Sequence, residues 1–144
     1  MTVGDPLPLP LGFQRFHRTA FINYQLNRAH SLGLADADDL RRGAARVSRP
    51  GNVPAVFKEI AEQAASQRRH RAAIGAMRIA EFFTPGRDRR KHRRYGRFRE
   101  MVDLAFPDLA AARVDIAYRD GFLPAYHLPG GTGGRCSSTA DSTR

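Results

Sequence analysis

The sequence of 144 residues is poor in cysteine and has no long apolar run, and each shortage excludes a class of protein. The single cysteine, Cys136, excludes an internal disulfide framework and a multi-cysteine zinc site. No segment is apolar for long enough to span a bilayer, so we expect no membrane partner. Residues 1–10 are rich in proline and lack the basic and apolar regions of a signal peptide. The default expectation is therefore a cytoplasmic protein.

Lysine is also scarce, although the chain is strongly basic. Lysine and arginine together number 24 against 14 acidic residues, a formal net charge of +10. Lys58 and Lys91 are the lysines, so nearly all of this charge is arginine. One interpretation is a polyanionic partner bound through counterion release. The other is that abundant arginine, alanine and glycine follow from a GC-rich genome. We favour the second interpretation.

Apolar residues recur at steps of three and four along most of the chain, the period of amphipathic helices. Gly33 is a natural helix end, while Asp36 and Asn52 are suitable N-caps. The stripes are narrow, so each helix is expected to bury one face. Five helices are expected. The first two cover residues 12–33 and 36–47, the third begins after residue 52, the fourth ends at residue 84 and the fifth ends at residue 106. The predicted fold class is mainly α, an antiparallel helical bundle or helical-hairpin array.

The apolar period then changes to two residues. Alternation over residues 114–118 is typical of a strand, and Asp120-Gly121 is a signal for a tight turn. A return strand is expected over residues 122–128, where Pro124 restricts it to an edge or a bulge. A lone hairpin is marginally stable and needs another element to pack against.

Four parts are expected from these changes of composition. The proline-rich start and the glycine- and serine-rich end are both expected to be disordered. The parts are a lead-in at 1–11, a helical domain at 12–107, a β-hairpin at 108–129 and a tail at 130–144.

Three segments, taken in order, resemble one protein family. They read NYQLNRAHSLG (23–33), AAIGAMRIAEFFT (72–84) and IAYRDGFLPAYHLP (116–129). They resemble the N-terminal region of α/β-hydrolases with a helical domain before the catalytic domain, the family of 2,6-dihydroxypseudooxynicotine hydrolase and the FrsA-like hydrolases. The resemblance covers roughly residues 13–129. It implies that residues 12–107 are a cap packed over a catalytic domain, and that the hairpin begins the hydrolase sheet.

The catalytic motif of such a hydrolase is missing from the sequence. The family needs a Gly-x-Ser-x-Gly elbow, a later acid and a later histidine, and no Gly-x-Ser-x-Gly occurs here. Residues 135–144 can be encoded so that a shifted frame reads Val-Leu-Ile-Asp-Gly-Gly-Phe-Asp-Ser, a strand followed by the expected oxyanion-hole loop. We therefore expect an out-of-frame tail, from a real frameshift or a sequencing error. The chain is then a truncated hydrolase, inactive alone, whose full-length parent binds a small-molecule substrate.

No residue is expected to be catalytic, but the resemblance implies that some residues line the mouth of the parent's pocket. These candidates form two groups, residues 24–28 and residues 78–82, and the members of each group lie within about one helical turn. The alternative is that Arg28 and Glu81 tie helices together as an ion pair. The candidate pocket-lining residues are Tyr24, Asn27, Arg28, Arg78, Glu81 and Phe82.

The densest basic run extends over residues 87–99. It is either a phosphate-tracking face, with Tyr95 and Phe98 for stacking, or the solvated face of the fifth helix. We favour the solvated face and expect no nucleic-acid partner, because both aromatics follow the helical stripe. The five histidines form no recognised ligand motif, so no metal and no cofactor are expected. A small basic module that binds nucleic acid or protein stays the alternative, and exposed apolar surface predicts self-association.

Overall fold

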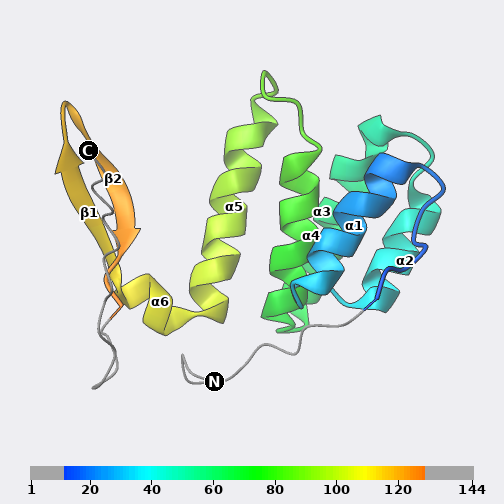
Figure 1. Cartoon of the computed structure of the whole chain (residues 1–144), viewed down its shortest axis with the longest axis horizontal. Coiled ribbons are helices and arrows are strands. Elements are labelled where there is room, and N and C mark those ends of the chain that lie inside the picture. Colours follow the sequence, from blue (N-terminus) through cyan, green and yellow to red (C-terminus); the bar gives the residue numbers. More distant parts are fainter. Residues whose placement is uncertain (1–11, 129–144) are drawn as a thin grey trace, which may run out of the picture. The chain divides into compact units, whose positions relative to one another are not determined.

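The structure is a computed structural model that describes residues 12–128 (Figure 1). These residues form two compact units, residues 12–107 and residues 108–128. The first is helical and the second carries an antiparallel β-hairpin, which confirms the predicted mainly α fold class followed by a hairpin. The predicted lead-in at 1–11 and the predicted tail at 130–144, with Cys136, lie outside the described residues.

The helical unit is arranged around its fourth helix. In order, it contains α1 (Ala20–Ser31), α2 (Ala37–Arg46), the 3-10 helix η1 (Pro50–Asn52), α3 (Val53–Ser66), α4 (His70–Phe82) and α5 (Arg90–Ala105). Helix α4 contacts α3, α5 and α1 (Figure 1). Nine of its 13 residues are buried, so the expectation of one narrow buried face per helix is wrong for α4. A helix enclosed by three neighbours buries most of its circumference.

One hydrophobic core joins the five α-helices of this unit. Small side chains at the contact between α3 and α4, including Ala61, Ala64, Ala73 and Ala80, are fully buried. They let the two helices approach closely, and larger side chains fill the space around them. The larger core residues include Ile22, Leu26, Leu40, Phe57, Met77 and Met101.

The first helix starts later than the predicted residue 12. The Oδ1 atom of Asn23 accepts hydrogen bonds from the backbone N–H groups of Phe16 (2.7 Å) and His17 (3.0 Å). The Oδ1 atom of Asn27 accepts another from the N–H of Gln14 (2.7 Å). Because these side chains take the backbone donors, the preceding segment stays non-helical and α1 begins at Ala20.

The predicted end of α1 is confirmed, whereas the predicted N-cap residues bond differently from what was expected. Gly33 ends α1 with a φ of 64°, as expected, and Arg68 ends α3 in the same left-handed conformation with a φ of 59°. Asp36 and Asn52 stand at the N-cap positions of α2 and α3, but neither side chain makes a capping hydrogen bond to that helix, and Asn52 instead accepts one from the N–H of Arg49 before η1. The Asp36 carboxylate instead accepts a 2.7 Å bond from Arg69. Surrounding partners therefore compete with the helix ends for these polar groups.

The second unit contains the end of the short helix α6 (Pro107–Ala111), followed by β1 (Arg113–Tyr118) and β2 (Gly121–Tyr126). The register is regular from Arg113–Tyr126 to Tyr118–Gly121, with no bulge at Pro124. The turn is Arg119–Asp120 rather than the predicted Asp120-Gly121, and Arg119 has a φ of 50°. Paired residues share a face. One face therefore carries Val114, Ile116, Tyr118, Leu123 and Ala125, and no other element of this unit covers it.

Candidate functional site

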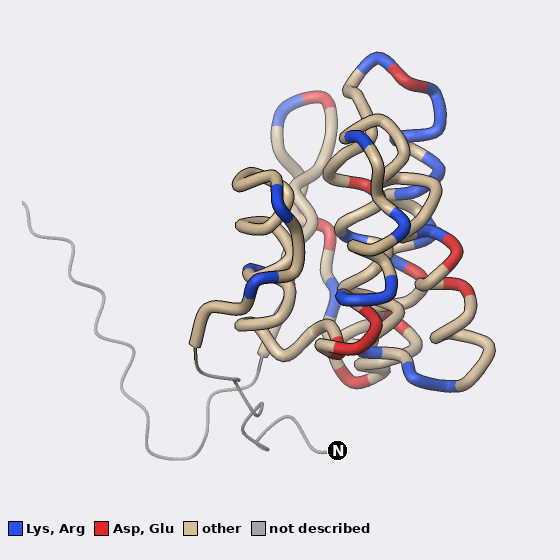
Figure 2. Tube along the Cα trace, turned by 90° about the vertical axis from the view of Figure 1, so that its right-hand side faces the viewer, with Lys and Arg blue, Asp and Glu red and all other residues tan. Residues whose placement is uncertain are grey.

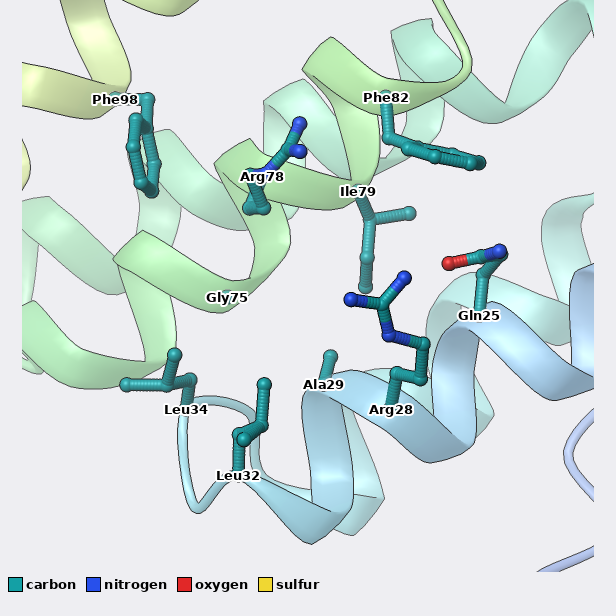
Figure 3. Close-up of a pocket in the computed structure, with 10 residues that line it drawn as sticks. All are labelled: Gln25, Arg28, Ala29, Leu32, Leu34, Gly75, Arg78, Ile79, Phe82 and Phe98. Atoms are coloured by element: carbon teal, nitrogen blue, oxygen red, sulfur yellow. The ribbon is translucent and has the colours of Figure 1, made fainter. Parts of the chain in front are cut away.

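The helical unit contains a cavity of about 220 Å³ between α1 and α4 (Figure 3). Its walls are mostly apolar. A cavity of about 150 Å³ accommodates benzene, so this one has room for a ligand with a single ring. Its lining residues are Gln25, Arg28, Ala29, Leu32, Leu34, Gly75, Arg78, Ile79, Phe82 and Phe98.

The depth of the cavity depends on a close approach between α4 and the loop that follows α1. A Cβ atom added to Gly75 would lie only 1.9 Å from the carbonyl oxygen of Leu34. Glycine is therefore the residue that lets this loop lie directly against α4. The lining residues follow the i, i+3, i+4, i+7 spacing, from Gln25 along α1 to its C-cap Leu32 and from Gly75 along α4.

Two arginines bring positive charge to this cavity. Arg28 extends from α1 toward Ile79 on α4 (Figure 3). Among residues 12–128, no carboxylate forms an ion pair with Arg28. Arg78 pairs with Glu81 and lies over the ring of Phe82, 5.9 Å from its centroid. Arg28 is thus the lining cation available to an anionic group of a ligand.

Glu81 is buried and serves to join α4 to α5. Its Oε1 atom lies 2.8 Å from the Nζ atom of Lys91, which also donates to the Glu81 carbonyl at 2.8 Å. Burial, together with the positive charge of Arg78, lowers the pKa of Lys91. The alternative that Arg28 and Glu81 tie helices together therefore holds for Glu81 but not as an ion pair with Arg28, because Glu81 pairs with Arg78 and Lys91. A buried carboxylate held by two cations has a structural role.

The six residues singled out in the sequence thus divide into two groups. Arg28, Arg78 and Phe82 line the cavity, whereas Tyr24, Asn27 and Glu81 do not. Tyr24 is 54% exposed. Asn27 is buried and bonds to both the N–H and the C=O of Gln14, so it positions the start of α1.

Sequence reasoning missed the other seven lining residues, which are Gln25, Ala29, Leu32, Leu34, Gly75, Ile79 and Phe98. The helical spacing of the lining residues was visible in the sequence. The pairing of the two helix faces was not, because it depends on the approach of the loop at Leu34 to Gly75.

The basic run is not a uniform solvated face. Acidic residues lie among the basic ones over the helical unit (Figure 2). Arg90 pairs with Asp88 at 2.6 Å and lowers the pKa of that carboxyl to about 2. Arg97 pairs with Glu62 at 2.8 Å, and its hydrogen bond lowers the pKa of Glu62 although burial opposes the shift. Arg94 is buried. The predicted solvated face is therefore wrong for Arg94, whereas Arg97 stays partly exposed and is paired.

No cluster of three potential metal ligands occurs within residues 12–128. No helix in that part of the chain is long and apolar enough to cross a membrane. Comparison with known proteins found no matching family model, no matching curated protein and no matching solved structure.

Proposed function

We propose that the helical unit is the substrate-covering cap of an α/β-hydrolase and that β1 and β2 begin the catalytic sheet. The proposal rests on the resemblance of residues 23–33, 72–84 and 116–129 to that family. The observation that supports it best is the apolar cavity with Arg28 among its lining residues, a cation that no carboxylate of residues 12–128 pairs with. In this role the cap offers the substrate an apolar recess and one positive group.

The chemistry proposed for the parent enzyme is serine-nucleophile hydrolysis of an ester, amide or C–C bond. Nucleophile, base, acid and oxyanion hole would all come from the catalytic domain, so we assign no catalytic residue within this chain. The chain's own contribution is to position the substrate and to keep water away from it.

Exposed apolar surfaces in both units also support the proposal. The Phe21 ring, 56% exposed, packs against Phe82 and Phe83 with centroid distances of 6.1 Å and 5.6 Å. Phe82 also lines the cavity, so an apolar surface continues from the cavity along α1. In the hairpin, Ile116 and Leu123 are each more than half exposed on its apolar face. Exposed apolar surface of this kind is typical of a protein contact.

The first test reads the genomic DNA after the codon for Leu128 in all three frames. We expect one frame to continue with a buried strand, a Gly-x-Ser-x-Gly elbow and a late histidine. The protein encoded by that frame is then expressed, and its Arg28→Ala variant is expected to raise KM by about tenfold or more. Arg18→Ala, a matched change at an exposed arginine outside the cavity, is the control. If all three frames lack these features, the proposal is wrong.

The 144-residue chain itself should not hydrolyse p-nitrophenyl esters above a matched protein blank, because it has no activated nucleophile elbow. Saturable turnover that is lost when a serine or Cys136 is replaced would contradict this expectation.

The alternative, a nucleic-acid-binding module, has less support. Carboxylates neutralise Arg90 and Arg97 within the basic run, which interrupts any continuous track for a phosphate backbone. We expect duplex DNA and RNA to bind no more tightly than about micromolar at physiological salt. Sequence-selective nanomolar binding would favour the alternative.

A further inference from the structure

A second concavity, of about 460 Å³, lies where α3, α4 and α5 meet, and cations surround it. Its floor includes Met77 of α4, which is fully buried. No acidic residue of the described part of the chain lines it. The other lining residues are Lys58, Arg90, Arg93, Arg94 and Arg97. Such a concentration of one charge within a single concavity is unfavourable unless an anion compensates it.

Only part of this charge is compensated by the described residues. Arg90 is paired with Asp88, and Arg97 with Glu62 and Glu100. Within residues 12–128, Lys58, Arg93 and Arg94 form no ion pair. Lys58 acts on the Glu62 carboxyl at longer range and helps Arg97 to lower its pKa. In the part of the chain that the structure describes, three cations around one concavity therefore lack a directly bonded counter-charge, and Glu62 and Asp88 act on Lys58 and Arg94 only at longer range.

Arg94 is the decisive member of this group because it is buried. Its relative exposure is 8%, and one terminal nitrogen donates a 2.5 Å hydrogen bond to the Oγ1 atom of Thr84. Its Nε atom is also buried and has no hydrogen-bond partner in the described part of the chain. Burial and the neighbouring charge of Arg90 lower the pKa of Arg94, although Asp88 opposes the shift at longer range. A guanidinium stays charged near neutral pH, so an anion that bonds to this buried group directly would stabilise it.

We propose that Lys58, Arg93 and Arg94 form a binding site for the phosphate group of a small phosphorylated molecule. The planar guanidinium groups of Arg93 and Arg94 match a phosphate with paired N–H donors, and Lys58 adds a third charge from α3. The buried position of Arg94 favours a group that enters the concavity over a polymer that passes across it. Arg90 and Arg97 also line the concavity, but each already pairs with a carboxylate, Arg90 with Asp88 and Arg97 with Glu62.

The test titrates the 144-residue chain with inorganic phosphate, followed by calorimetry and by the NMR signals of arginine Nε–H groups. Sodium chloride at the same ionic strength is the control for screening. We expect saturation at one phosphate per chain and a selective shift of the Arg94 Nε–H signal. Arg94→Gln should weaken binding about tenfold or more, and Arg93→Gln by several-fold, as expected for charge-assisted hydrogen bonds. Arg18→Gln removes the same charge outside the concavity and should change affinity less than about twofold.

Arg93 and Lys58 are exposed, so Arg93→Gln and Lys58→Gln retain the test even if Arg94→Gln fails to fold. Glycerol phosphate, duplex DNA and vesicles containing phosphatidylserine then distinguish the sources of phosphate. We expect glycerol phosphate to compete with inorganic phosphate for one site. The proposal is overturned if phosphate binding does not saturate, or if chloride gives the same calorimetric and NMR response as phosphate. It is also overturned if Arg18→Gln and Arg93→Gln lose the same phosphate affinity. DNA or vesicle binding that phosphate cannot displace would also overturn it.

Discussion

Replacement of Gly75 by alanine should test the close approach on which the cavity depends. The added Cβ atom would lie 1.9 Å from the oxygen and 2.6 Å from the carbon of the Leu34 carbonyl. An ordinary C···O contact is about 3.3 Å, so loop and helix must separate by about 1.4 Å. Overpacking costs about 1–3 kcal/mol, and a clash with backbone belongs at the upper end of that range. Alanine regains about 1 kcal/mol of helix propensity, which leaves a net loss of about 2 kcal/mol.

The matched control is Gly96→Ala in α5. A Cβ atom there meets nothing within 4 Å, so the propensity gain acts alone. In thermal unfolding we expect Gly75→Ala to lower Tm by about 10 °C and Gly96→Ala to raise it by about 4 °C or more. Urea unfolding should give the same order of stabilities. If Gly75→Ala is as stable as the parent chain, the contact between α4 and the Leu34 loop is not as described.

Three further predictions concern single features of the two units. Arg68→Gly should stabilise the helical unit by about 1 kcal/mol in urea unfolding, because Arg68 has a φ of 59°; unchanged or lower stability would contradict this. The lowered pKa of Glu62 gives stability that is fully present above its ordinary pKa of about 4.3 and is lost as the pH falls through the lowered value. In urea unfolding, the free energy of unfolding should therefore fall less between pH 6 and pH 3 in Arg97→Gln than in the parent chain. Equal falls would refute the assignment of the lowered pKa of Glu62 to Arg97. Deletion of residues 108–144 removes none of the core residues that the structure describes, so far-UV helicity should persist while sedimentation shows less self-association. Loss of cooperative unfolding in the shortened chain would contradict this prediction.

Most of the fold could be predicted from the sequence because the signals involved are local. The three- and four-residue apolar spacing indicated the helices, and Gly33 ended α1 as expected. The start of α1 could not be predicted in the same way. Phe13 and Phe16 continue the helical spacing, but the Asn23 side chain captures the N–H of Phe16 and stops the helix short of it. That bond becomes visible only when the tertiary structure is known.

The candidate site could be predicted in part for the same reason. Arg28, Arg78 and Phe82 belong to helical stripes, and they line the cavity. Glu81 lies one position before Phe82 on α4, yet Lys91 and Arg78 bind it away from the lining. The burial of Arg94 within a run of exposed arginines had no sequence signal, because it follows from the packing of α5 against α4.

Helix α4 contributes to both proposed sites, but through different faces. Gly75, Arg78 and Phe82 line the cavity, whereas Met77 lies about 150° around the helix axis from the centre of that stripe and lines the basic concavity. The two sites share no lining residue, so their key cations, Arg28 from α1 and Arg94 from α5, act in separate environments. Effects of distant substitutions without shared partners are usually additive. A change at Arg28 should therefore leave phosphate binding intact, which means that the cap proposal and the phosphate-site proposal can fail independently of each other.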